Sequence, residues 1–190
     1  MNRRRVLVLL AGLLVSRRAG AGEVPPDRQG VLFLRSLAYD RNFKTRSGSA
    51  VSVLVLYRAG NQPSQSMKTD MVGALEELAK TVTVLDLPVK VSSAPFTNGD
   101  ALDEKIRAAQ ASVVYVCIGL DDAIPAISEV TRRRSALSIG ANDTFVAAGL
   151  SLAIVARGTK PTIVLNPTAS QAEGCEWDPQ FLRLVQIVKS

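Results

Sequence analysis

The sequence predicts an α/β fold: a three-layer domain with a mixed, mainly parallel sheet that ends in a C-terminal hairpin plus helix. Short apolar runs rich in β-branched residues alternate with amphipathic stretches of helical period, which is typical of parallel strands joined by crossover helices. The last third of the chain instead has two apolar runs separated by only a few residues, which indicates an antiparallel hairpin. At 190 residues the chain is long enough for one domain with a full core.

Capping residues and periodicity place each element in order. The predicted helices are 30–46, 66–82, a short helix capped by Thr97 or Asn98, a helix from Asp121 or Asp122 to 133, and a last helix that begins at Asp178-Pro179. The predicted strands are 50–57, 84–91, 112–119 and 137–141, followed by the hairpin strands 150–156 and 162–165 around Gly158.

Three local details refine this assignment. Gly48 is expected to end the first helix with a left-handed backbone conformation. Pro88 lacks an N–H and should place its strand at a sheet edge or at a bulge. Leu182, Val185 and Val188 recur on one face of the last helix, and we expect that face to pack on the core.

The first 21 residues have the layout of a signal peptide. Residues 3–5 are arginines, 6–15 are mostly aliphatic, and 19–21 form a small-residue cleavage site. The apolar run is about half of the ~20 residues that a membrane-spanning helix needs. We therefore expect a periplasmic protein whose single domain is 22–190. The Sec and twin-arginine routes both fit, and a misplaced start or an uncleaved anchor are the alternatives.

The net charge of +6 comes from this leader. Five of the 23 basic residues lie before residue 22 with no acidic residue among them, which leaves 18 against 17 acidic residues. A nearly neutral domain has no electrostatic feature for nucleic acid. The sequence therefore predicts no nucleic-acid partner.

No residue pattern predicts catalysis. The chain has no histidine, which excludes Ser-His-Asp and Cys-His centres and most zinc sites, and it has no phosphate-binding glycine loop. Asp121 and Asp122 are adjacent at a helix start and are interpreted as caps rather than as an acid–base pair. We expect no enzyme activity, no cofactor and no metal. Arginines 132–134 fit the end of a helix, with an anion-binding patch as the alternative.

Four polar residues are candidates for a small-ligand site. Arg58 and Asn61 follow the first strand, and Asn142 and Asp143 follow the fourth. Ligands of open α/β sheets bind outside the carboxyl ends of the strands, so these side chains could line one pocket. The alternative is that they serve only turns and helix caps.

Two cysteines remain in the predicted mature chain. An oxidising compartment would permit one disulfide between Cys117 and Cys175. The alternative is a pair of free thiols, one in a buried strand and one in a loop.

The C-terminal third resembles the YfiR-like periplasmic family. The turn around Asn142 and Asp143, the Phe145 to Gly149 segment, two strands that end at Asn166 and the helix around Leu182 follow that family's pattern. The resemblance covers most of residues 30–189. These are packing and turn residues, so they specify a fold more than an activity.

The resemblance implies an exported, non-catalytic regulator that represses an inner-membrane diguanylate cyclase, and so lowers cyclic-di-GMP signalling and biofilm formation, by protein–protein binding. Two departures are a first helix with charged residues in place of aromatic ones and cysteines that allow only one bond. The alternative function is a periplasmic small-ligand sensor. A homodimer, through the first helix or a sheet edge, is a further expectation.

Overall fold

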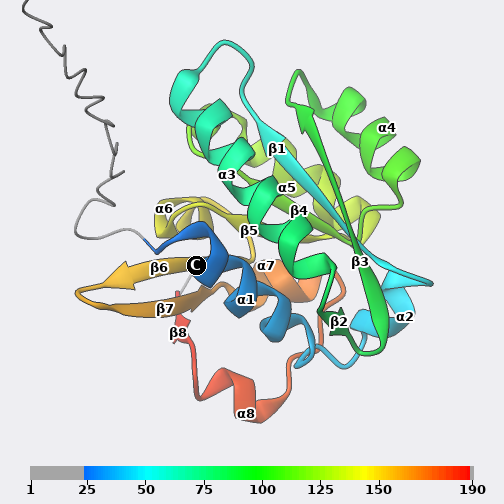
Figure 1. Ribbon diagram of the computed structural model, residues 1–190, viewed down its shortest axis with the longest axis vertical. Coiled ribbons are helices and arrows are strands. Elements are labelled where there is room, and N and C mark those ends of the chain that lie inside the picture. Colours follow the sequence, from blue (N-terminus) through cyan, green and yellow to red (C-terminus); the bar gives the residue numbers. More distant parts are fainter. Residues whose placement is uncertain (1–23, 189–190) are drawn as a thin grey trace, which may run out of the picture.

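Eight strands form one sheet in the computed structural model, which describes residues 24–188 (Figure 1). Their order is β2-β3-β1-β4-β5-β6-β7-β8. The strands are β1 Val51–Tyr57, β2 Thr83–Val84, β3 Leu87–Pro95, β4 Val113–Val116, β5 Leu137–Gly140, β6 Leu152–Arg157, β7 Lys160–Leu165 and β8 Gln186–Ile187. The predicted signal peptide, 1–21, lies outside the described residues.

Helices cover both faces of the sheet and make three layers. They are α1 Pro26–Leu37, α2 Phe43–Ser47, α3 Gln62–Ala79, α4 Gly99–Ala109, α5 Ile124–Arg134, α6 Asp143–Ala147, α7 Pro167–Ala172 and α8 Pro179–Leu182, with a 3₁₀ turn Asp121–Ala123 before α5. One core lies under α1 and α3, and a second lies under α4 and α5. The predicted mainly parallel, mixed α/β fold is confirmed. None of the described helices is long and apolar enough to cross a bilayer.

The continuous apolar strands are explained by the two cores. In β1, Val53 and Val55 belong to the core under α3, whereas Leu54 and Leu56 belong to the core under α4 and α5. Successive side chains of a strand point to opposite faces. A strand covered on both faces therefore needs apolar residues at every position.

The first predicted helix, 30–46, is wrong as a single element. The chain forms α1, a turn and then α2, and Asp40 in the turn is 1% exposed. The Asp40 carboxylate accepts hydrogen bonds from the N–H groups of Asn42 and Glu176. A contact with a residue 136 positions away thus breaks the helix. A glycine of positive φ does end the helix, as expected, but Gly48 has φ of 64° and ψ of −118°, which is not the left-handed helical conformation.

Several helix and strand boundaries differ from the predicted ones, because short turns and asparagine caps lie within the predicted segments. The predicted strand 84–91 is a hairpin, in which Leu85 and Asp86 have φ of 51° and 67° between β2 and β3, the conformation of a two-residue turn. Helix α3 begins earlier than predicted, since Asn61 caps it. Helices α6 and α7 were missed, and their caps are Asn142 and Asn166.

The hairpin β6–β7 matches the prediction, with Gly158 at φ of 61° in its turn. The last helix does not. Asp178 caps it as expected, but α8 ends at Leu182 and the chain continues into β8, which pairs with β7. Val185 is therefore only partly buried against the main core, and Val188 packs against a separate small cluster.

Phe181 fastens this C-terminal segment to the core. It is 1% exposed, and its ring stacks between those of Tyr39 and Trp177, with centroid distances of 5.3 and 4.7 Å. We predict that Phe181→Ala lowers the free energy of unfolding by about 3–5 kcal/mol because it leaves a cavity between two rings. Urea unfolding followed by circular dichroism measures this.

The matched control is Leu184→Ala, three residues further on, where the side chain is 67% exposed. Its effect should stay within about 0.5 kcal/mol. Equal losses for both variants would contradict the assignment of Phe181 as the anchor.

Candidate functional site

The carboxyl edge of the sheet divides the four predicted ligand residues into two pairs. At β1, the Arg58 Nε donates a hydrogen bond to the Gly119 carbonyl at 2.5 Å, and its guanidinium pairs with Asp122. The Asn61 carboxamide oxygen accepts from the Ser64 N–H at 3.0 Å as the cap of α3. These contacts close the edge over β1 and β4 with protein groups.

At β5, Asn142 caps α6 by accepting from the Phe145 N–H at 3.0 Å. Asp143 pairs with Arg157 of β6 at 2.6 Å. The hydrogen bond from the Arg157 guanidinium lowers the pKa of the Asp143 carboxyl, so this pair stays charged at neutral pH.

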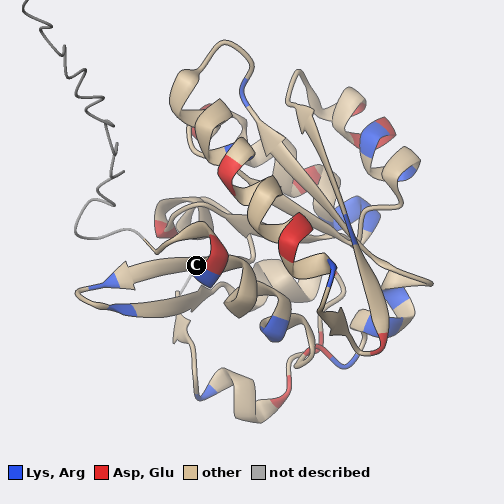
Figure 2. Ribbon diagram, viewed as in Figure 1, with Lys and Arg blue, Asp and Glu red and all other residues tan. Residues whose placement is uncertain are grey.

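A groove of about 1020 Å³ opens beside Asn142 and Asp143 and is bounded by α1, α3 and the β6–β7 hairpin. Arg58 and Asn61 do not line it. The structure therefore brings two of the four predicted residues to a cavity and leaves the other two in the closed half of the edge. Figure 2 shows acidic residues on α1, α3 and α6, the helices around this groove.

The groove combines apolar walls with polar and charged side chains at its margin. Its walls include Val24, Met67, Met71, Ile118 and Ile154. No cluster of three or more His, Cys, Asp or Glu residues with metal-binding geometry occurs among residues 24–188. The groove has a volume in the range of small-molecule sites.

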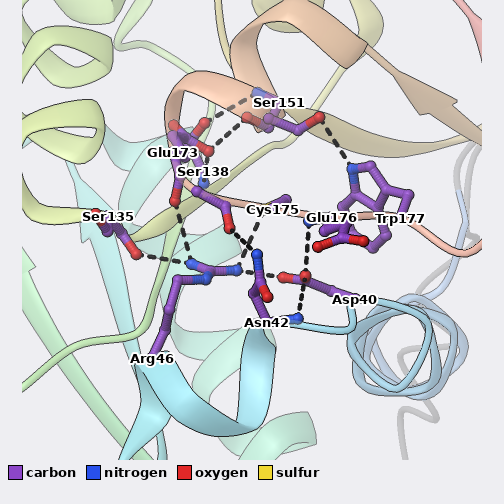
Figure 3. Close-up of polar contacts among 12 residues, drawn as sticks. Asp40, Asn42, Arg46, Ser135, Ser138, Ser151, Glu173, Cys175, Glu176 and Trp177 are labelled. Carbon is purple, nitrogen blue, oxygen red and sulfur yellow. Dashed lines mark hydrogen bonds and ion pairs between the residues drawn. The ribbon is translucent and has the colours of Figure 1, made fainter.

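A buried ion pair at the opposite, amino-terminal edge was missed by the sequence interpretation (Figure 3). Arg46 of α2 pairs with Asp40, and its side chain and that of Asp40 are 12% and 0% exposed. Arg46 Nη1 also donates to the Ser135 carbonyl at 2.7 Å, and Nη2 contacts the Cys175 sulfur at 3.2 Å. The pair thus joins the turn after α1 to the segment before α8.

Glu173 is a second buried charge-bearing group in the same region, with 0% exposure. Its carboxylate accepts hydrogen bonds from the Thr131 hydroxyl at 2.6 Å, from the Ser138 N–H at 2.8 Å and from the Ser151 hydroxyl. Burial raises the pKa of the Glu173 carboxyl, and these donors partly oppose the shift. No local sequence pattern marks it, because its partners lie 22 to 42 residues away.

The two cysteines are free, buried thiols in this structure. Cys117 follows β4 at the carboxyl edge, where its N–H bonds the Leu56 carbonyl, whereas Cys175 lies beside Arg46 at the amino edge. A four-residue strand spans roughly 13 Å, and disulfide Cα atoms lie within about 7 Å. Burial raises the pKa of the Cys117 thiol to about 12 and raises that of Cys175 as well. The disulfide that the sequence permits is thus not formed here.

Together, the two-faced sheet, the groove at its carboxyl edge and the buried polar network at its amino edge define one three-layer α/β domain. The family comparison agrees: residues 41–186 match the YfiR/HmsC-like family, and the chain belongs to that family. It is a family of periplasmic, non-catalytic regulators with protein partners in signalling. No curated protein matches the chain in sequence.

Solved structures share the fold at low identity. A conserved domain protein from Vibrio cholerae is 14% identical over 88% of this chain and 61% of its own, with a TM-score of 0.63. The ABC domain from Streptococcus pneumonia in complex with L-Trp is 11% identical over 86% and 62%, with a TM-score of 0.58. A ligand-free, open substrate-binding protein with adhesive properties from Clostridium difficile is 18% identical over 78% and 58%, with a TM-score of 0.56. This chain spans about three fifths of each.

Because the Asp40–Arg46 ion pair is buried, we predict a large loss of stability when one of its partners is removed. Arg46→Ala should lower the free energy of unfolding by about 3–5 kcal/mol, because it leaves the Asp40 carboxylate buried without a cation. The control is Arg41→Ala, whose side chain is 54% exposed in its pairs with Glu176 and Asp178; its cost should stay below about 1 kcal/mol. Similar chemical-denaturation midpoints for the two variants would refute the difference.

The burial of Glu173 predicts that the free energy of unfolding depends on pH. Its folded-state pKa lies above the ordinary 4.5, so the folded protein binds this proton more tightly than the unfolded chain. The resulting stabilisation is complete below pH 4.5 and is lost as pH rises through the folded pKa. Glu173→Gln removes the titration and keeps an oxygen for the Ser138 N–H.

We therefore expect the stability of wild type relative to Glu173→Gln to fall as pH rises above 4.5. Urea unfolding across the pH range measures the difference, in which all other titrating groups cancel. Exposed Glu104→Gln is the control and should show no such trend. A constant difference between wild type and Glu173→Gln would mean that Glu173 titrates normally.

Proposed function

We propose that this chain is an exported regulatory protein that acts by binding an inner-membrane signalling protein, in the manner of the family's repressors of membrane diguanylate cyclases. Its effect would be a lower cyclic-di-GMP level and less biofilm. Membership of the YfiR/HmsC-like family supports this role.

The observation that carries the proposal is a short apolar strip, Leu184 and Ile187, in the chain segment that ends in the edge strand β8. Leu184 and Ile187 are 67% and 48% exposed. Tyr39, whose ring stacks on that of Phe181, is 38% exposed. They are the large apolar side chains that are exposed among the described residues. Exposed apolar side chains beside an edge strand favour association with another polypeptide. A homodimer through this edge is the competing use of the same strip.

The test is a single charge placed in this strip. Leu184→Asp should leave the folded domain intact, since the side chain is exposed, and should reduce recovery of a membrane signalling protein in pull-downs at least tenfold. Ala108→Asp, at an exposed position of α4, places the same charge at a distant part of the domain (Figure 1) and should leave recovery unchanged.

Light scattering of both variants separates the two uses of the strip. If wild type is a dimer that Leu184→Asp dissociates, while the membrane pull-down is unaffected, then the strip serves self-association. Recovery of no membrane protein by wild type, together with unchanged cyclic-di-GMP on gene deletion, would overturn the regulatory proposal.

A second candidate function is sensing of a small ligand, and the groove favours it. Its volume of about 1020 Å³ is sufficient for a small organic molecule. The L-Trp complex and the substrate-binding protein among the structural neighbours have the same fold class. A regulator whose partner binding responds to a ligand would unite both candidates.

A further inference from the structure

The strand β3 has one side without a strand partner over most of its length. Along one side it pairs with β1 from Val89 to Pro95, but on the other side β2 pairs only with Leu87 and Pro88. Among residues 24–188 no other strand pairs with β3. The sheet therefore has an open edge here, at the end opposite to β8 (Figure 1).

The open backbone groups of this edge belong to two residues in the middle of β3. Successive residues of a strand direct their N–H and C=O groups to opposite sides. The Phe96 N–H donates to the Tyr57 carbonyl of β1 at 2.8 Å, so every second residue before Phe96, Ser92 among them, also faces β1. Val91 and Ser93 therefore face outwards. Within the described part of the chain, no group hydrogen-bonds to the N–H or C=O of either residue.

Neither helical layer overhangs the middle of this edge. Side chains of successive strand residues point to opposite faces of the sheet. Ser92 and Ser93 are both exposed, whereas every residue of β1 from Val51 to Leu56 is buried. A second strand can therefore approach β3 from the side, and an open edge favours such an addition. Pro95 has no N–H and limits the added ladder to a short one.

We propose that β3 pairs with β3 of a second copy of this chain, antiparallel and across a twofold axis at Ser92. In this register Val91 of one copy lies opposite Ser93 of the other, and the two residues exchange both of their hydrogen bonds. The N–H and C=O groups that each copy leaves open are then all satisfied. The interface is isologous, as a closed dimer requires.

The arrangement of groups and charge favours a second copy in this orientation. An identical strand has the same open groups at the same spacing, so it needs no change of shape to pair. Lys90 is the one charged residue of β3 and is exposed. Antiparallel pairing about Ser92 places Lys90 opposite Ala94 of the second copy, with the two lysines roughly 13 Å apart. Parallel pairing in register would place them side by side, where like charges destabilise a sheet.

This dimer goes beyond the proposed regulatory function. The apolar strip of Leu184 and Ile187 lies in the segment that ends in β8, at the other end of the sheet. A dimer through β3 therefore leaves that strip accessible on both copies. One dimer could then contact two copies of a membrane partner.

The test is disulfide trapping of Ser92→Cys. The variant places a thiol at the twofold axis, where opposite Cα atoms of a pair without mutual hydrogen bonds lie about 4.5 Å apart, within the range of a disulfide. We expect mild oxidation to convert it to a covalent dimer on a non-reducing gel. The control Lys90→Cys has an exposed thiol roughly 13 Å from its counterpart and should give about a tenth as much or less. Wild type should give none, because its two thiols are buried.

A proline substitution tests the backbone pairing. Ser93→Pro removes an outward N–H that has no described partner, so the domain should still fold, which circular dichroism verifies. In sedimentation velocity it should weaken the dimer more than about tenfold, because two inter-strand hydrogen bonds are lost. It should also prevent trapping when combined with Ser92→Cys. The matched control Ser93→Ala keeps the N–H and should dimerise as wild type does.

Three results would overturn the proposal. Equal trapping of Ser92→Cys and Lys90→Cys would refute the register. A wild type that is monomeric at every concentration measured would refute the dimer. A dimer that Leu184→Asp dissociates and Ser93→Pro does not would place self-association at β8. The regulatory proposal stands or falls separately, by whether wild type recovers a membrane protein in the pull-down.

Discussion

The Asp40–Arg46 ion pair is the contact on which the C-terminal third of the fold depends. Arg46 bonds carbonyls of Ser135 and Glu173 as well as Asp40, so one guanidinium joins the α1–α2 turn, the start of β5 and the end of α7. Because the pair is almost completely buried, each charge is tolerated only through the other. Trp177 and Phe181 then pack on the segment that this pair positions.

The buried charged groups and the groove lie at opposite edges of the sheet. The buried charges Asp40, Arg46 and Glu173 gather near the amino ends of the strands, where most of their partners come from segments more than 20 residues away. The groove lies at the carboxyl ends, where loops can vary without disturbing that network. A ligand in the groove and a partner at β8 would both contact elements next to the β6–β7 hairpin, since Ile154 lines the groove and β7 pairs with β8.

The local chemistry of the sequence predicted much of the fold. Alternating apolar runs gave the parallel sheet, and Asn98, Asp178 and Gly158 took the cap and turn positions expected of them. The failures have non-local causes. The helix expected at 30–46 is broken by the contact of Asp40 with Glu176, and the last helix ends early because β7 offers an edge to which β8 can pair. The sequence predicted that Asn142 and Asp143 lie at a pocket. It did not predict that residues of α1 and α3 line the same groove, because only tertiary packing brings those helices there.

The shape of the carboxyl edge follows from how far each strand extends. β5 ends at Gly140, which is paired with Ala153, but β6 continues for four more residues to Arg157. At about 3.3 Å per residue, the hairpin therefore extends roughly 13 Å past the end of β5. Figure 1 shows the β6–β7 hairpin projecting from the rest of the sheet. All four of those residues line the groove, opposite residues of α1 and α3. Over β1 and β4 no strand projects in this way, so Arg58, Gly119 and Asp122 can meet across the edge and close it. One sheet edge thus has a closed half and an open half because of strand length, and the open half is where a ligand would bind.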